Sequence, residues 1–265
     1  MNMGWWQTNY QWVLGIIVAL IATSIAQIVA HHLTLKRDRN KYLTECYQNF
    51  YSPILYKVLL FFDVKTAFSK KDIRDDISIS EEEIFKDILD LFSKNLKYAT
   101  PNLIAAYEMV KKRDIYDDVS GQRNPISEIE LCFKFLEEVA DISKKLKINT
   151  EEIDLLRYRV LFAIWLLLSK YGACEAGHTV MRFDFEFNDK KLNKRTLRKV
   201  KKLLNRDFDT RGEMLLLVTE KLIIKIVEEN HRGVEYNPLI LQIMRQELKE
   251  RGLKSKRLEK LFVEN

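Results

Sequence analysis

The sequence predicts a mainly all-α protein, in which a single N-terminal transmembrane helix precedes a cytosolic helical bundle. Three observations support this prediction. The first 35 residues contain no Asp, Glu, Lys or Arg. The 265 residues include only 8 Gly and 4 Pro, which is few for a β-rich or loop-rich chain. Residues that commonly cap helices recur in front of segments with helical apolar spacing.

The predicted span covers residues 12–35. Its most apolar part, Trp12–Ala30, supplies 19 residues without a fixed charge. A bilayer core about 30 Å thick needs roughly 20 apolar residues of helix. Soluble helices of this length normally turn a charged face to water. The segment is therefore interpreted as a membrane anchor.

The flanks of the span predict its orientation. Aromatic residues suited to the membrane interface precede it, and basic residues follow it. These interface anchors are Trp5, Trp6, Tyr10 and Trp12 on one side, and Lys36, Arg37, Arg39 and Lys41 on the other. Because positive flanks stay in the cytosol, we expect a single-pass protein of the cell membrane with its N-terminus outside and its C-terminal domain cytoplasmic. A cleaved signal peptide fits less well, since the segment lacks a basic n-region and exceeds a usual h-region.

Small residues within the span recur at intervals of four. Gly15, Ala19 and Thr23 follow the spacing that lets two transmembrane backbones approach closely, and Gln27 could hydrogen-bond across such a pair. A homodimer formed through the span is one hypothesis. The alternative is a solitary span whose Ser and Thr hydroxyls bond to their own helix.

Three parts of the chain are expected. They are a tail with the transmembrane helix (1–35), a cytosolic helical bundle (36–172), and a C-terminal helical subdomain packed on the bundle (173–265). Caps, prolines and apolar periodicity set the helix boundaries. The first expected helix is Leu43–Phe68, in which Pro53 should cause a kink or break near Ser52. Ser80 opens the next helix, which runs through Phe92, and Thr100-Pro101 opens a third that runs to Tyr116. The remaining expected helices are Ile126–Leu146, Ile153–Tyr171, Arg211–Glu229, Pro238–Arg251 and Lys254–Phe262.

Two segments depart from amphipathic helix. Val160–Leu168 is apolar on every side, but its nine residues are too short to cross a bilayer. We expect it to be the central buried helix. Residues 181–187 alternate apolar and charged side chains with a period of two, which predicts one short strand or hairpin. Because no partner strand is evident in the sequence, we slightly favour an extended packing segment over a hairpin or an edge that pairs with a second copy.

The main charge feature is the segment 190–206, expected to be a basic helix. It holds nine basic residues and no acidic ones: Lys190, Lys191, Lys194, Arg195, Arg198, Lys199, Lys201, Lys202 and Arg206. Removing these nine from the 44 Lys and Arg leaves 35, against 38 Asp and Glu, so the net positive charge of the chain comes from this segment. Leu197, Val200, Leu204 and Phe208 recur at helical spacing and predict the packed face.

This helix has several possible roles. It could be a solvated surface helix without a ligand, or it could lie on the anionic inner leaflet, where each Lys or Arg contributes roughly 1 kcal/mol. Binding to nucleic acid phosphates is less favoured, because no known nucleic-acid-binding signature accompanies the charge. An acidic protein partner is the remaining possibility.

The sequence contains no recognisable catalytic or metal-binding constellation. Phosphate-binding glycine motifs and nucleophile elbows are absent, and three separated cysteines argue against a disulfide framework or a cysteine-based zinc site. Cys174 and His178 lie close in sequence, but glycines place them in a predicted loop. We therefore expect no enzyme and no cofactor.

The function that the sequence favours is a membrane-anchored interaction or regulatory module with a protein partner. The alternative is a membrane effector, toxin-like or acting in host defence, that perturbs the bilayer when its cytosolic domain is triggered.

Overall fold

The computed structural model describes residues 3–66, 80–115, 126–171, 178, 181 and 190–205. Within these residues all regular secondary structure is helical, which confirms the all-α prediction. The chain divides into two compact units, Met1–Cys46 and Tyr47–Asn265. Apart from Met181, which is helical, the predicted strand lies outside the described residues, as do the three helices predicted after residue 206.

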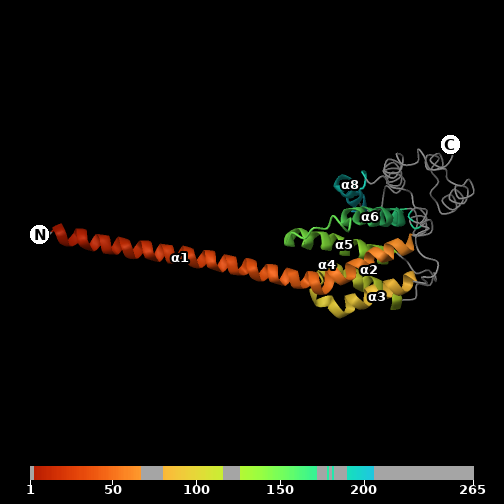
Figure 1. Ribbon diagram of the computed structural model, residues 1–265, viewed down its shortest axis with the longest axis horizontal. Helices are drawn as coiled ribbons and strands as arrows, with labels where there is room; N and C mark the ends of the chain where they lie inside the picture. Colours follow the sequence, from red (N-terminus) through yellow and green to blue (C-terminus); the bar gives the residue numbers. More distant parts are fainter. Residues whose placement is uncertain are drawn as a thin grey trace, which may run out of the picture. The chain divides into compact units, whose positions relative to one another are not determined.

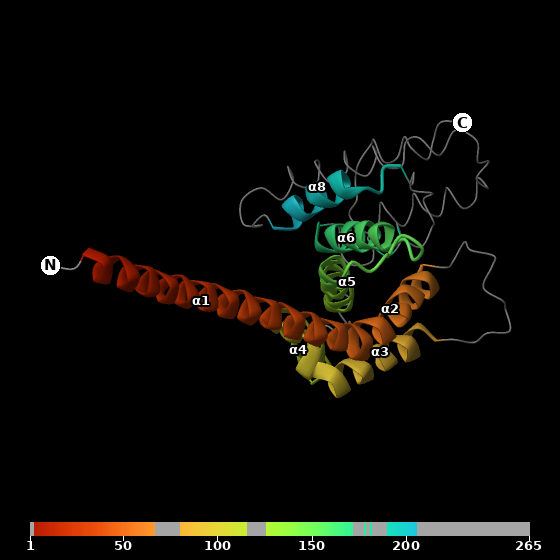
Figure 2. The ribbon, with the colours of Figure 1, turned by 60° about the vertical axis from the view of Figure 1, so that its left-hand side comes forward.

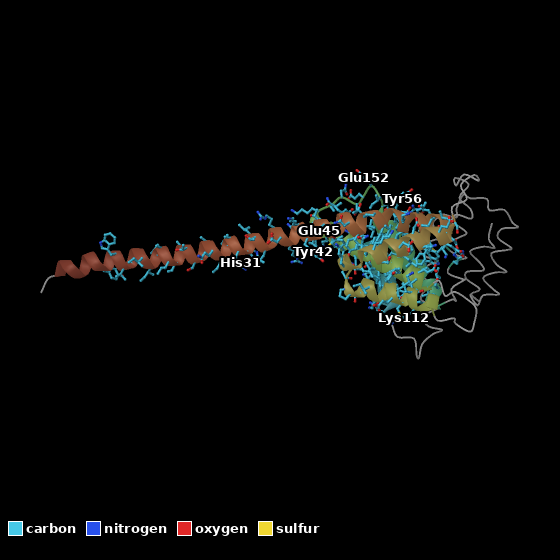
Figure 3. All side chains as sticks on the ribbon, turned by 90° about the horizontal axis from the view of Figure 1, so that it is seen from below. His31, Tyr42, Glu45, Tyr56, Lys112 and Glu152 are labelled. Carbon is cyan, nitrogen blue, oxygen red and sulfur yellow. The ribbon has the colours of Figure 1, made fainter. Side chains whose placement is uncertain are left out.

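The first unit consists of helix α1, Met3–Cys46 (Figure 1). Among the described residues, the continuous helical stretch that begins with α1 is the one candidate that is long and apolar enough to cross a membrane. No side chain between Trp12 and Leu35 is buried or half-buried. In Figure 3 the sticks of this helix, with His31 labelled, project from several sides of the ribbon.

The second unit, from Tyr47 onward, is called the helical domain below. Its elements are a π-helical turn η1 (Tyr47–Tyr51), α2 (Ser52–Lys65), α3 (Glu81–Asn95), a 3-10 turn η3 (Leu96–Tyr98), α4 (Pro101–Ile115), α5 (Ile126–Leu146), α6 (Leu155–Tyr171) and α8 (Lys194–Leu204). Helix α5 packs against α4 and α6, while α2 packs against α3. Figure 2 shows α6 between α5 and α8, so α8 forms one outer layer of the described domain.

Three predicted helix starts, after Ser80, after Thr100 and at Ile126, are confirmed. The Ser80 hydroxyl accepts a hydrogen bond from the Glu82 amide at 3.2 Å, and so caps the N-terminus of α3. Thr100 precedes α4, and its hydroxyl accepts from the Leu103 amide at 3.4 Å. Helix α6 was predicted to start at Ile153, but it starts at Leu155. The residue before it, Asp154, has a φ of 45°, a left-handed conformation that an α-helix cannot include.

The irregularity predicted at Pro53 takes the form of the π-helical turn η1. Proline has no amide hydrogen, and its ring clashes with the carbonyl of the residue four positions earlier, here Asn49. A wider turn accommodates this clash without ending the helical secondary structure. Helix α2 begins directly after η1, with Pro53 in its first turn.

Aromatic side chains form two groups in the core of the helical domain. Phe50 of η1 meets Phe92 of α3 and Phe135 of α5, with ring centroids 5.1 and 6.1 Å away. Phe62 of α2 packs on Phe162 and Trp165 of α6 at 5.0 and 5.8 Å. All nine residues of Val160–Leu168 are buried, as predicted for the central helix.

Candidate functional site

The described interface anchors on α1 are exposed. Tyr10 and Trp12 have exposed fractions of 68% and 72%, and the side chains of Trp5 and Trp6 lie outside the described residues. The four basic residues that follow the span, from Lys36 to Lys41, are exposed as well. This arrangement is compatible with interface anchoring, which remains a prediction.

The hydroxyl groups within the candidate span bond to their own helix. Thr23 donates to the carbonyl oxygen of Ala19, and Ser24 donates to that of Leu20 at 2.8 Å. A Cβ added at Gly15 would meet no atom within 4 Å, so the small-residue face is open. The hydroxyl bonds match the solitary-span alternative, and association through Gly15, Ala19, Thr23 and Gln27 remains a prediction.

The basic helix is shorter than predicted. It covers Lys194–Leu204, because the side chain of Asn193 accepts hydrogen bonds from the amides of Arg195 and Thr196 at 2.9 and 3.2 Å and so caps its N-terminus. Lys190 and Lys191 lie in the turn before this cap. The cap signal is visible in the sequence as Asn193 directly before a periodic segment. Arg206 lies outside the described residues.

Helix α8 buries one face on the domain. The buried residues are Thr196, Leu197, Val200 and Leu203, together with Leu192 just before the helix. Leu204, predicted to belong to this face, is only half-buried, and Phe208 lies outside the described residues. Leu203 is buried in place of Leu204 because α6 packs against the side of α8 that carries Leu203. The spacing of apolar residues in the sequence could not show which of the two leucines would be buried.

Glu137 of α5 links three helices through one carboxylate. Its Oε1 accepts from Arg159 of α6, at 2.8 Å from Nε and 2.7 Å from Nη2, while its Oε2 pairs with Lys201 of α8. Lys201 therefore fastens α8 to the bundle. Sequence reasoning missed this contact, because Glu137 and Lys201 are 64 positions apart and no local pattern relates them.

Five basic residues of α8 contrast with Lys201. Lys194, Arg195, Arg198, Lys199 and Lys202 are exposed, and none of them has an acidic partner within 4 Å among the described residues. We call these five residues the cationic face. A run of unpaired positive charges on a fixed helix attracts anions, above all surfaces that carry many negative charges.

The neighbouring residue, Glu138, makes a second polar link. Its Oε2 accepts from the Tyr51 hydroxyl at 2.8 Å, and its Oε1 accepts from the hydroxyl of Thr100. The carboxylate thus joins η1, α5 and the N-terminus of α4. Local sequence signals identified Thr100 as a cap but gave no indication of its acidic partner.

The described residues do not assemble a catalytic or metal site. No group of three or more His, Cys, Asp or Glu could hold a metal ion in the part of the chain that the structure describes. Cys132 is buried, which raises the pKa of its thiol well above its usual value, and nearby Glu128 adds to the effect. A protonated, buried thiol is a poor nucleophile. Cys174, considered above beside His178, lies outside the described residues.

Comparison of the chain with protein-family profiles, with curated proteins and with solved structures finds no match. The candidate span on α1 and the cationic face on α8 are therefore interpreted from their own chemistry.

Proposed function

We propose that this chain is a single-pass membrane protein whose helical domain is a cytosolic interaction or regulatory module. The exposure of α1 is the observation that carries the proposal. In its most apolar window of 18 residues, none of the residues is buried. Apolar side chains such as Leu20, Ile21 and Ile28 have exposed fractions of 62%, 55% and 69%.

An uncharged helix of this kind needs an apolar surrounding. Burying apolar surface is favourable by roughly 25 cal/mol per Å², so Trp12–Ala30 would be strongly disfavoured in water. A core helix of a soluble domain would be largely covered, whereas these side chains are not. A bilayer supplies the missing cover, since 19 helical residues extend about 28 Å, close to the thickness of its hydrocarbon core.

The orientation follows from the charges that flank the span. Lys36, Arg37, Arg39 and Lys41 would remain in the cytosol, and the uncharged N-terminus would cross. The helical domain would then face the cytosol beside the inner leaflet, held there by its tether. A module of stacked helices without a described catalytic constellation is suited to contacts with other molecules.

Extraction of membranes from expressing cells tests the anchor. We expect the full-length chain to stay in the pellet after alkaline carbonate washing. The double substitution Ile17→Arg with Ile21→Arg should release it, because each Arg at the centre of a span costs about 2.5–3.5 kcal/mol on insertion scales. Met109→Arg, a similar change at an exposed apolar residue of α4, serves as the matched control and should remain in the membrane.

Two outcomes would contradict the proposal. One is release of the unsubstituted chain by carbonate, and the other is a mature chain that has lost residues 1–35, as a cleaved signal peptide would predict. Protease applied to intact cells tests the orientation. It should remove an N-terminal tag while a C-terminal tag stays protected, and the reverse pattern would overturn the assigned direction.

A further inference from the structure

We infer that the cationic face of α8 binds the phosphate headgroups of anionic lipids from the water side, without inserting apolar side chains. The inference rests on the proposed membrane anchor, which would hold the helical domain beside a lipid surface. It assigns a ligand class to five specific residues: Lys194, Arg195, Arg198, Lys199 and Lys202.

Several basic residues of the domain are neutralised by acidic partners, whereas these five have none within 4 Å among the described residues. Lys57 pairs with Asp87 at 2.6 Å, Lys65 lies 3.5 Å from both Glu81 and Glu128, and Lys201 pairs with Glu137. The cationic face has no such neutralisation among the described residues. Within the part of the domain that the structure describes, its charges are thus open to an external anion.

The position of the charges within the helix supports an external anion as well. Lys194 and Arg195 occupy the first turn of α8, which contains no acidic residue. The N-terminal end of a helix carries partial positive charge and normally favours Asp or Glu. Two cations there repel this end, and a bound phosphate would relieve the repulsion. Departures from such a helix rule, uncompensated among the described residues as here, are typical of functional positions.

The buried face of α8 determines how the helix would meet a membrane. Amphipathic helices that lie in the interface insert their apolar face among the acyl chains. In α8 that face, which includes Leu197, Val200 and Leu203, is already buried on the domain, and Lys201 is held by Glu137. Binding would therefore use the exposed charges alone and should be strongly sensitive to salt.

The tether favours lipid over nucleic acid as the anion. A tethered domain meets its own leaflet at a high effective concentration, so modest affinity per charge is sufficient. Lys and Arg bind the phosphates of nucleic acids as well as those of lipids. The proximity of the leaflet is therefore what favours clustered lipid phosphates as the ligand.

Energy transfer between the domain and a bilayer tests the inference on the full-length chain. The chain, with Cys174→Ser and Asn205→Cys, would carry a donor dye at the end of α8, since Cys46 and Cys132 are buried. It would be reconstituted in nanodiscs that contain acceptor-labelled lipid and either neutral lipid alone or about 30% phosphatidylglycerol. We expect higher transfer with the anionic lipid, and loss of that increase in about 0.5 M salt.

The variant Arg195→Gln, Arg198→Gln and Lys202→Gln should lose this increase, because three charges change a surface-binding constant on the order of a hundredfold. The matched control removes three exposed lysines elsewhere, Lys144, Lys145 and Lys147, and should behave as the parent protein. Val200→Ala should not reduce the anionic response, because that side chain makes no lipid contact. Circular dichroism verifies that each variant keeps its helix content.

Several results would overturn the inference. Equal transfer with neutral and anionic lipid would do so, as would an unchanged response in the Arg195, Arg198 and Lys202 variant. A short DNA or RNA duplex that binds through the same residues, while transfer stays constant, would assign the face to nucleic acid. Failure of the chain to elute with the nanodisc would instead contradict the proposed anchor, so the two failures are distinguishable.

Discussion

Glu137 and Glu138 are adjacent in α5, yet their carboxylates bind different parts of the helical domain. Glu137 joins α6 and α8 through Arg159 and Lys201, whereas Glu138 binds Tyr51 of η1 and the residue before α4. Successive residues of a helix project about 100° apart, which allows neighbouring side chains to serve separate contacts. Through this pair, α5 makes polar contacts with η1, with the N-terminus of α4, and with α6 and α8.

Glu137→Gln should loosen α8 from the bundle. The substitution removes the charge that binds Arg159 and Lys201, and both carboxylate contacts are partly shielded from water. We expect the free energy of unfolding to fall by about 1–2 kcal/mol. Urea unfolding in mild detergent measures this change, and faster hydrogen exchange in α8 than in α3 should accompany it.

Glu130→Gln provides the control for that experiment. Glu130 pairs with Lys134 at 3.1 Å and Lys170 at 3.7 Å, in contacts more open to water than those of Glu137. Its loss should cost below about 0.5 kcal/mol. Equal effects of the two substitutions would show that Glu137 has no special part in holding α8.

Tyr51→Phe and Thr100→Ala should be energetically coupled. Both hydroxyls donate to the Glu138 carboxylate, and the Thr100 hydroxyl also caps α4. We expect a loss of about 1 kcal/mol for Tyr51→Phe and about 1–2 kcal/mol for Thr100→Ala. The double variant should differ from the sum of the two by at least 0.5 kcal/mol, as residues sharing one partner do. Strict additivity in urea unfolding would count against a shared carboxylate.

The stability of the helical domain should fall at alkaline pH because of Cys132. Burial raises the pKa of its thiol in the folded state above the unfolded value, so the folded state holds the proton more tightly. The resulting stabilisation is complete below about pH 8.5, the unfolded thiol pKa, and is lost as the pH rises above it, by up to about 1.4 kcal/mol per pH unit. Urea unfolding at pH 8 and pH 10 should show a larger loss for the parent protein than for Cys132→Ala. Equal losses would contradict this assignment.

Trp165→Phe should cost much less than Trp165→Ala. Trp165 is fully buried beside Phe62 and Phe162, but its indole nitrogen donates to no acceptor among the described residues. Phenylalanine therefore loses packing volume and no hydrogen bond, for which we expect about 1–2 kcal/mol, whereas alanine leaves a cavity costing about 3–5 kcal/mol. A similar loss for both variants in thermal unfolding would indicate that the indole N–H is needed.

Local sequence signals predicted much of the helical framework. Ser80 and Thr100 begin helices because their hydroxyls satisfy free backbone amides, a requirement set within one turn. The burial of Val160–Leu168 was predicted from its lack of polar residues. Pro53 indicated the irregular turn, because proline lacks an amide hydrogen and its ring clashes with the preceding helical turn. The predicted start of α6 was wrong by two residues, because no strong sequence signal indicates that Asp154 adopts a left-handed turn conformation.

The anchor candidate and the excess of positive charge were determined by the sequence alone. An uncharged segment of 35 residues and nine clustered basic residues are properties of composition, and no folding is needed to see them. Tertiary structure decided which of those charges remain available. It pairs Lys201 with Glu137, buries Leu203 and leaves five cations exposed, because α8 can turn only one side toward α6. That choice depends on contacts between residues far apart in the chain, which periodicity in one segment cannot encode.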